Sequence, residues 1–298
     1  MPTTYCRALG TAFLTLMAAP FAAAQTIAED LPVIGQPVPS GTGFQPAATE
    51  LARDLQWLDG MILVIITCIS LFVTALLGIV IWRFRQGRNE TPATFTHNSP
   101  LEIAWTVIPV LILVFIGSFS LPTLFKQQVI PEADVTIKET GYQRYWGYEY
   151  VDHEFAFDSF MIGYGEGNFN ESISAQLAEA GYSDEHFLLA VDNAVVVPVD
   201  QTIVMQVTGG DVIHSWTIPS FGVKQDAVPG RLAELWFRAE EEGIYFGQCS
   251  ELCGKDHAYM PITVKVASQE TYETWLEEAV ALYAGDPTTL PGYRVARN

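Results

Sequence analysis

Two long stretches without a charged side chain constrain what this chain can fold into. They cover residues 60–82 and 103–125, each 23 residues long. A helix needs about 20 apolar residues to cross the hydrocarbon core of a bilayer. Pro109 and Gly117 in the second stretch are compatible with this, because spanning helices tolerate both residue types. A buried helix of a soluble protein is the alternative, but two such stretches favour a transmembrane hairpin over residues 58–125.

The N-terminus has the pattern of a secretory signal peptide. Arg7 is followed by an apolar run over residues 8–19, and three alanines occupy residues 22–24. This pattern predicts a signal peptide over residues 1–24. An uncleaved membrane anchor is the alternative, although the apolar run is short for one. Residues 25–57 are then an exported segment that precedes the hairpin.

Charged residues around the two stretches predict their orientation. The connection over residues 83–90 carries three arginines and one glutamate, whereas residues 25–59 carry one arginine and five acidic side chains. Short loops rich in arginine and lysine stay on the cytoplasmic side. We therefore expect a protein of the bacterial inner (plasma) membrane, surrounded by lipid, with both mature termini in the periplasm.

The region after the hairpin, residues 126–298, is strongly acidic. It carries ten lysines and arginines against 27 aspartates and glutamates, a net charge of −17. This sign, together with the exported location, excludes nucleic acid as a partner. A solvated acidic face is one interpretation, and electrostatic steering of a basic partner is the other.

The same region has the pattern of an antiparallel β-sandwich or barrel. Short stretches rich in β-branched and aromatic residues alternate with glycine, proline and aspartate. The predicted strands lie within residues 134–150, 195–208, 211–219, 233–239, 243–249 and 261–267. A glycine-rich loop and a short helix interrupt them at 160–186, and a final helix is predicted over 268–285 with Ser268 as its N-cap.

Several potential metal ligands gather in one predicted strand connection. Cys249, Cys253, His257 and Met260 lie in "GQCSELCGKDHAYM", and His214 lies on an earlier predicted strand. A disulfide between the two cysteines is chemically feasible in an oxidising compartment. A structural zinc site of two cysteines and two histidines fits the ligand number. Thiolate and imidazole with a weak thioether are typical of copper electron-transfer sites.

The second cysteine favours a dinuclear copper centre. A blue-copper site uses a single thiolate, whereas two thiolates can bridge two ions and leave one histidine for each. Met260 and a backbone carbonyl can then be weak ligands, one for each ion. Sharing one electron between two bridged ions keeps reorganisation small, which favours fast transfer. The alternative is an exported membrane-anchored domain with a structural zinc or disulfide clip, which leaves Met260 unexplained.

These motifs resemble subunit II of the bacterial, alphaproteobacterial-like, haem-copper cytochrome c oxidases. The metal motif carries the resemblance together with "DVIHSW", "KQDAVPGR" and "THNSPLEIAWTVIP". The resemblance implies a membrane protein of the α plus all-β class, in which a two-helix transmembrane hairpin precedes a cupredoxin-like β-sandwich. The sandwich, residues 126–298, would carry a dinuclear copper centre called CuA.

The resemblance also implies a function and partners. The chain would be the electron-transfer subunit of a respiratory oxidase, taking electrons from cytochrome c and passing them to haem in subunit I. Oxygen reduction to water, coupled to proton pumping, would take place elsewhere in the complex. Subunit I and other oxidase subunits, cytochrome c and membrane lipid are the implied partners. The quinol-oxidase form of subunit II is a rival, but it lacks the copper ligands.

Roles for individual residues follow from the same resemblance. The copper ligands would be His214, Cys249, Cys253, His257, Met260 and the backbone carbonyl of Glu251. The Glu251 side chain would bind a magnesium or manganese ion shared with subunit I, and Glu102 would stand at the entrance of a proton-uptake pathway. Carboxylates facing cytochrome c are implied at Glu149, Asp152, Asp158, Asp192 and Asp211.

One position departs from the family pattern. In "GYQRYWGYEY", Arg144 stands where the family has a surface tryptophan through which the electron enters. Tyr142, Tyr145 or Trp146 could provide the contact instead, or the partner could be less basic or attached. Arg144 could also be an inactivating substitution, which is the interpretation we favour. We expect it to slow electron entry without preventing copper binding.

Overall fold

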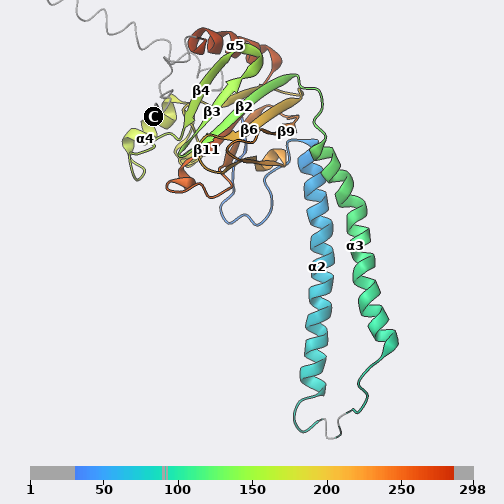
Figure 1. Cartoon of the computed structure of the whole chain (residues 1–298). Coiled ribbons are helices and arrows are strands. Elements are labelled where there is room, and N and C mark those ends of the chain that lie inside the picture. Colours follow the sequence, from blue (N-terminus) through green and yellow to red (C-terminus); the bar gives the residue numbers. More distant parts are fainter. Residues whose placement is uncertain (1–30, 89–90, 92, 285–298) are drawn as a thin grey trace, which may run out of the picture. The chain divides into compact units, whose positions relative to one another are not determined.

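The computed structural model describes residues 31–88, 91 and 93–284, so the predicted signal peptide lies outside the described part (Figure 1). The chain divides into two compact units. The helical unit is Arg53–Val129, and the β-rich unit combines the residues before it with those after it. Residues 31–52 belong to the same unit as the β-domain.

Two larger sheets and a two-stranded sheet build the described part of the β-rich unit (Figure 1). The larger sheet has the strand order β4-β3-β2-β6-β9 and the smaller has the order β1-β10-β11-β5. The larger sheet consists of β2 (Val135–Tyr142), β3 (Tyr145–Tyr150), β4 (Phe155–Phe160), β6 (Ile203–Gly209) and β9 (Ala233–Phe237). The smaller consists of β1 (Val33–Gly35), β5 (Val195–Pro198), β10 (Gly243–Gln248) and β11 (Pro261–Ala267), while β7 (His214–Ile218) pairs with β8 (Val223–Ala227).

The strand pairing differs from the antiparallel pattern that the sequence suggested. β2 pairs with β6, β11 with β5, and β1 with β10, all in parallel. Strand direction depends on which segments meet in the fold, and alternation within a segment carries no information about that. The sequence analysis also missed β1, β4 and β8. β4 carried only a weak signal, because its buried positions include Ser159 while Phe160 is partly exposed.

One continuous core joins the two sheets. It contains inward-facing aromatic side chains of β3, such as Trp146 and Tyr148, together with the valines of β5 and β11. β3 alternates between buried and partly exposed residues, as expected for a strand with one face on a core. β11 is buried at every position, which explains its nearly continuous apolar sequence. The fold is therefore a cupredoxin-like sandwich, as predicted.

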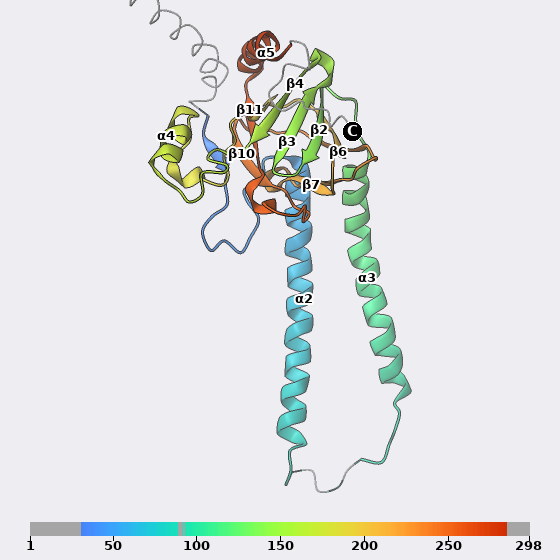
Figure 2. The same ribbon diagram turned by 60° about the vertical axis from the view of Figure 1, so that its left-hand side comes forward.

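Two helices cover the β-rich unit. α4 (Glu171–Glu179) starts at the N-cap Asn170 and packs its buried residues with Phe246 of β10, and Figure 2 shows it beside that strand. α5 (Gln269–Tyr283) buries Tyr272 and Trp275 in the main core. The predicted N-cap is confirmed, because Ser268 Oγ accepts a hydrogen bond from the Thr271 N–H at 3.2 Å.

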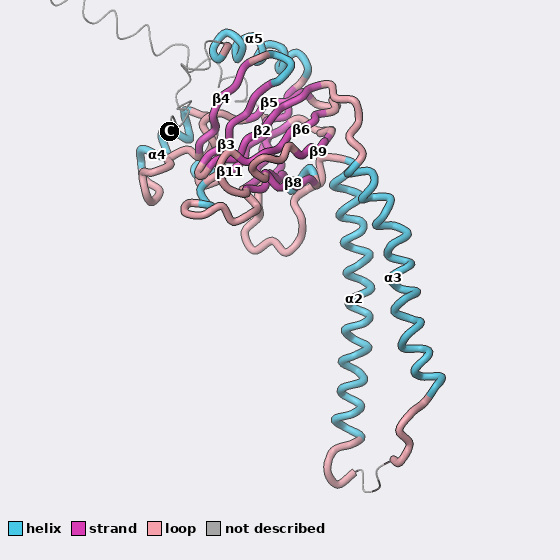
Figure 3. Tube along the Cα trace, viewed as in Figure 1, coloured by secondary structure: helices cyan, strands magenta, loops and turns pink. Residues whose placement is uncertain are grey.

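The helical unit is a hairpin of α2 (Glu50–Arg83) and α3 (Ser99–Gln128) (Figure 3). Lys126 Nζ lies 2.7 Å from Asp54 Oδ2, and the rings of Trp57 and Phe119 are 5.3 Å apart. These contacts join the start of α2 to the end of α3, so the two helices are antiparallel. Both are long and apolar enough to cross a membrane, and none of the residues in their apolar windows is buried. This agrees with the predicted transmembrane hairpin.

Candidate metal centre

The predicted metal ligands lie in the connection between β10 and β11. The two strands pair in antiparallel register up to Gln248 and Pro261, and the N–H of Cys249 then donates to the carbonyl of Met260 at 3.3 Å. Cys249 and Met260 are thus fixed at the base of the connection. We call residues 249–260 the ligand loop.

A second hydrogen bond brings in the histidine from a distant part of the sequence. The N–H of Ser250 donates to the carbonyl of Ser215 at 2.9 Å, which ties the ligand loop to β7. His214 is the first residue of β7 and is fully buried. The sequence analysis named His214 and the loop residues as ligands of one metal site, and the structure brings them together.

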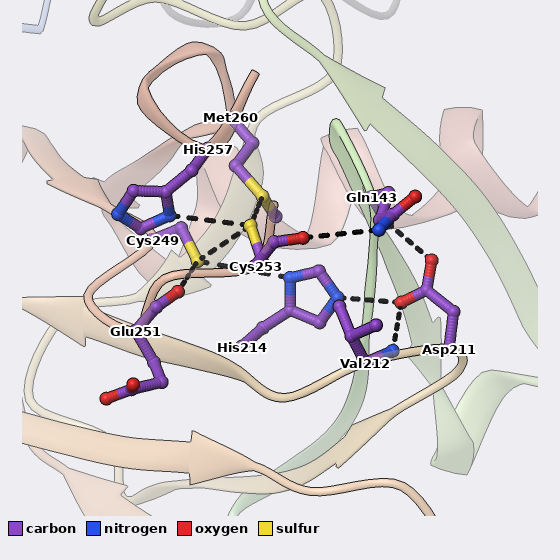
Figure 4. Close-up of polar contacts among 9 residues, drawn as sticks. All are labelled: Gln143, Asp211, Val212, His214, Cys249, Glu251, Cys253, His257 and Met260. Carbon is purple, nitrogen blue, oxygen red and sulfur yellow. Dashed lines mark hydrogen bonds and ion pairs between the residues drawn. The ribbon is translucent and has the colours of Figure 1, made fainter. Parts of the chain in front are cut away.

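The donor atoms form two matching halves around the two sulfurs (Figure 4). The Sγ atoms of Cys249 and Cys253 are 3.8 Å apart. On one side, Cys249 Sγ lies 3.9 Å from His214 Nδ1 and 3.3 Å from the carbonyl oxygen of Glu251. On the other, Cys253 Sγ lies 3.4 Å from His257 Nδ1 and 3.4 Å from Met260 Sδ. Each sulfur therefore has one imidazole nitrogen and one weak donor beside it.

This donor set fits two bridged copper ions. Each half offers two shared thiolates, one imidazole and one weak ligand, which suits copper better than zinc, because zinc needs no thioether. Cys249 and Cys253 are both free thiols, and their separation is well beyond the roughly 2.05 Å of a disulfide bond. The three buried residues His214, Cys249 and Cys253 alone place their ligand atoms within 4.8 Å of one another.

The Asp211 carboxylate lies beside the outer ring nitrogen of His214. Its Oδ1 lies 2.8 Å from His214 Nε2 (Figure 4). An N–H at Nε2 that donates to this carboxylate leaves Nδ1 free for a metal, and such carboxylate partners are typical of metal-binding histidines. The hydrogen bonds to Asp211 also keep the pKa of its carboxyl below the ordinary value, although burial acts in the opposite direction. Asp211 is therefore an orienting residue as well as a predicted docking residue.

The electrostatics of the two thiols favour a bound cation. Burial acts to raise the pKa of Cys249, but hydrogen bonds to His214 and to nearby backbone lower the pKa more, so it lies below the ordinary value of a cysteine thiol. Burial and the charge of Cys249 raise the pKa of Cys253 to about 12. Two thiolates at this separation repel each other, so holding both ionised requires a positive charge between or beside them.

The turn between β2 and β3 contacts the ligand loop from the side. Gln143 Nε2 donates to the carbonyl of Cys253 at 3.3 Å, and the Gln143 N–H donates to Asp211 Oδ2 at 2.8 Å. Trp146 Nε1 donates to the carbonyl of Met260 at 3.2 Å. Gly141 presses against His214, since a Cβ at this glycine would lie 2.8 Å from His214 Cγ. The sequence analysis did not single out Gln143 or Gly141, although both stand in the run around Arg144.

The four residues considered for electron entry are not equivalent. Arg144 is exposed and Tyr145 is partly exposed, whereas Trp146 is fully buried. Trp146 therefore cannot touch a docked partner directly and could act only as an internal step. Tyr142, Tyr145 and Phe160 stack on the outer face of the larger sheet, with ring centroids 4.9 and 4.6 Å apart.

The five predicted docking carboxylates are distributed over the outer face of β3 and β4 and the adjoining loops. Glu149 pairs with Lys138 at 2.8 Å, and Asp152 accepts from the Thr136 N–H at 3.0 Å. Burial raises the pKa of Asp158 to about 6 and, despite hydrogen bonds from backbone, that of Asp192 to about 6. Asp211 is exposed beside the ligand loop. Most of these acids thus also hold local structure.

The remaining two predicted residues lie in different environments. The Glu251 side chain is exposed and points away from the sulfur atoms (Figure 4). Glu102 lies in the first turn of α3, where its Oε1 accepts a hydrogen bond from the Asn98 N–H at 3.3 Å. The Glu102 side chain therefore has a structural role, because it helps to cap the start of α3.

Fold and site together define a membrane-anchored cupredoxin-like protein with a thiolate and imidazole metal centre. The family model for "Cytochrome C oxidase subunit II, periplasmic domain" matches residues 135–267, and that for "Cytochrome C oxidase subunit II, transmembrane domain" matches residues 37–123. The chain belongs to the cytochrome c oxidase subunit II family.

The chain is similar to several individual proteins of known family or structure. Cytochrome c oxidase subunit 2 of Cereibacter sphaeroides is 64% identical over 268 residues, which cover 89% of this chain and 88% of the relative. A probable cytochrome c oxidase subunit 2 of Rickettsia felis is 45% identical over 242 residues, covering 81% of this chain and 72% of the relative. The crystal structure of the periplasmic domain of subunit II of cytochrome oxidase of Bradyrhizobium japonicum is 46% identical, with a TM-score of 0.44, and covers 52% of this chain and 99% of that one.

Proposed function

We propose that this chain is the electron-transfer subunit of a cytochrome c oxidase and holds two copper ions between Cys249 and Cys253. The arrangement of two thiols, each with its own imidazole and its own weak donor, carries the proposal. When bound, the copper pair would accept and release one electron at a time. His214 and His257 would be the terminal ligands, and Asp211 would orient His214. Family membership supports an electron donor of the cytochrome c type and a haem acceptor in subunit I.

The proposed orientation places the β-rich unit in the periplasm and the arginine-rich connection between α2 and α3 in the cytoplasm. The charge asymmetry of the flanks supports this orientation. In this arrangement Glu102, at the start of α3, lies at the cytoplasmic end of the hairpin. That position supports its proposed place at the entrance of a proton-uptake pathway. The domain limits 1–24, 25–57, 58–125 and 126–298 remain part of the proposal.

We also propose that the exposed Glu251 carboxylate binds magnesium or manganese at the contact with subunit I. Its backbone carbonyl faces Cys249 Sγ while its side chain is directed away from the sulfurs. One residue would thus touch both metal sites, which would place the magnesium ion close to the copper pair.

Docking of the electron donor would use the acidic face. Glu149, Asp152, Asp158, Asp192 and Asp211 give this face a negative charge that would attract a basic protein and raise its association rate. Arg144 lies next to Gln143, which contacts the ligand loop directly. A guanidinium there supplies no aromatic contact, so we expect slow electron entry compared with a tryptophan.

The test uses the full chain in detergent, loaded with copper. We expect two copper ions per chain and thiolate-to-copper absorption, followed by reduction in stopped flow with reduced cytochrome c. Arg144→Trp is run beside it and should be reduced faster. One zinc ion in the purified chain, or no thiolate-to-copper absorption after loading, would instead support the structural zinc or disulfide clip.

A further inference from the structure

Arg144 contacts the ligand loop, and the proposed role of this position in electron entry does not account for that contact. It is the second residue of the two-residue turn between β2 and β3, and its φ of 87° lies in the left-handed region. Its Nε lies 3.6 Å from Oδ2 of Asp256. The two side chains are 47% and 23% exposed, so the pair is only partly screened by water. The guanidinium is therefore directed along the protein surface towards the ligand loop.

Asp256 is the point where separate elements meet. It directly precedes His257 and is itself in the left-handed region, with φ 66°, where it begins a short 3-10 turn. Tyr164, from the glycine-rich turn after β4, donates its hydroxyl hydrogen to Asp256 Oδ2 at 3.1 Å. The same carboxylate oxygen thus receives Arg144 from one side of the loop and Tyr164 from another.

Local hydrogen bonds also hold the segment around Asp256. The N–H groups of His257 and Tyr259 donate to the carbonyls of Gly254 and Asp256, and Gln248 Nε2 donates to the carbonyl of Ala258. Gly254 has a φ of 107°, and Gly254, Lys255, Ala258 and Tyr259 are exposed. The neighbouring turn residue, Gln143, holds the carbonyl of Cys253. The two residues of the β2–β3 turn therefore hold the loop at both ends of the segment from Cys253 to Asp256. His257, the more exposed of the two histidines, follows directly.

We propose that Arg144 is a positioning residue for the copper centre, which acts through Asp256 to hold His257 in place. This inference rests on the proposed copper function, but it concerns retention of the metal and not electron entry. It also gives Arg144 a structural role of its own, in addition to its replacing the tryptophan of the family pattern. The positive charge of Arg144 is offset locally by the negative charge of Asp256. The acidic face proposed for docking of the electron donor therefore stays acidic around the β2–β3 turn.

The test measures release of copper from the loaded full chain in detergent to an excess of a copper(I) chelator after reduction. Partly exposed ion pairs contribute little individually, so Arg144→Gln and Asp256→Asn should each speed release by roughly two- to fivefold. The double variant should release copper no faster than the faster single variant, because both remove the same contact. Arg144→Lys should restore part of the retention. Asn tolerates the left-handed backbone at position 256, so Asp256→Asn preserves the turn.

A second readout does not need copper. Amide hydrogen exchange of residues 254–259 in the copper-free chain should become faster in Arg144→Gln and Asp256→Asn, while exchange in β10 and β11 stays unchanged. Lys255→Gln is the matched control, because it removes an exposed charge from the same segment. Equal effects of Lys255→Gln and Arg144→Gln on amide exchange would overturn the proposal. A double variant whose acceleration of copper release equals the product of the two single-variant accelerations would overturn it as well.

Arg144→Trp separates this inference from the proposed function. It should accelerate reduction by cytochrome c and at the same time lose copper faster than the unaltered chain. Faster reduction with unchanged copper release would support the proposed function and reject the positioning role. Failure of the unaltered chain to take up copper would reject the proposed function itself.

Discussion

The imidazole of His214 lies between the carboxylate of Asp211 and the thiol of Cys249, with Nε2 2.8 Å from the former and Nδ1 3.9 Å from the latter. This places Asp211 directly behind a proposed copper ligand, on the side away from the sulfur atoms (Figure 4). The carboxylate therefore influences the metal site without touching it, and the copper-binding strength should depend on it.

Asp211→Asn should weaken copper binding by about 10- to 100-fold, the usual effect of losing a carboxylate behind a metal-bound histidine. An amide retains the shape but gives up the charge that favours an N–H at Nε2. Competition with a chelator on the full chain measures the change. Asp226→Asn is a suitable control, because Asp226 is an exposed acid on the neighbouring strand β8. Equal affinities of the Asp211 and Asp226 variants would contradict the orienting role.

Copper binding should release protons and weaken as the pH falls. The pKa of Cys253 is raised to about 12 by burial and by the charge of Cys249, so this thiol is protonated in the copper-free protein at neutral pH. Binding of the metal must displace that proton. Because at least this one proton is released, the apparent affinity should fall by at least about tenfold for each unit of pH below neutrality. Chelator competition between pH 6 and 8 tests this, and a flat profile would contradict it.

Association with a basic donor should slow as the pH falls from 7.5 to 5.5. The pKa values of Asp158 and Asp192 are both raised to about 6, chiefly by burial, so these acids lose their charge over this interval. Loss of negative charge on the docking face lowers the steering of a positive protein. Stopped-flow association rates at several salt concentrations measure the effect.

Asp158→Asn combined with Asp192→Asn should lower the rate at pH 7.5 and flatten the pH profile. Glu234→Gln is the matched control, since Glu234 is an exposed acid on β9, at the opposite edge of the same sheet. If Glu234→Gln slows association as much as the aspartate variants, net charge alone accounts for the rate and the docking face is wrongly placed.

Glu139 should make the stability of the β-rich unit fall as the pH rises. Both carboxyl oxygens are buried without a hydrogen-bond partner, and burial followed by the charge of Cys249 raises the pKa of Glu139 well above its ordinary value. In the unfolded chain this group ionises above about pH 4.3. Between these two pKa values the folded chain keeps the Glu139 proton that the unfolded chain has lost. The stabilising contribution of this protonation is therefore fully present at low pH and is lost as the pH rises towards the folded-state pKa.

Glu139→Gln should reduce this pH dependence above about pH 7.5, where Asp158 and Asp192, with pKa values of about 6, are almost fully ionised. Thermal unfolding of the copper-free full chain, followed by near-ultraviolet circular dichroism, gives the midpoint at each pH. The slope is the informative quantity, because an unpartnered amide also destabilises the core at every pH. A slope identical to that of the unaltered chain would show that Glu139 is ionised in the folded state.

Gly141→Ala should disturb the metal centre through His214. A Cβ at Gly141 would lie 2.8 Å from His214 Cγ, closer than real Cβ contacts allow, so the imidazole ring has to shift. We expect a loss of about 1–3 kcal/mol of stability, as for other overpacked sites, and an altered thiolate-to-copper spectrum. Gly147→Ala on the neighbouring strand is the control, because its Cβ would lie no closer than 3.3 Å to Tyr142 Cε2 and 3.4 Å to Asp158 Oδ1. Unchanged spectra in both variants would contradict a tight His214 pocket.

Much of this protein could be predicted from local sequence patterns. The two uncharged stretches determined the hairpin, because crossing a bilayer requires length and apolarity that can be counted. The spacing of Cys249, Cys253, His257 and Met260 indicated the metal centre, because four donors in one loop stay close whatever the rest of the fold does. β11 was predicted at its observed bounds. The ligand loop ends directly before Pro261, and the helix N-cap Ser268 directly follows Ala267.

Only the tertiary structure decided how these parts are combined. The parallel pairing of β2 with β6 and the position of His214 beside the ligand loop depend on contacts between segments that are far apart in the sequence. The roles of Gln143, Asp256 and Glu139 depend on what lies across from each side chain, and neighbouring residues carry no information about that. The sequence therefore determined the chemistry of this protein, and the packing of distant strands decided which side chains hold that chemistry in place.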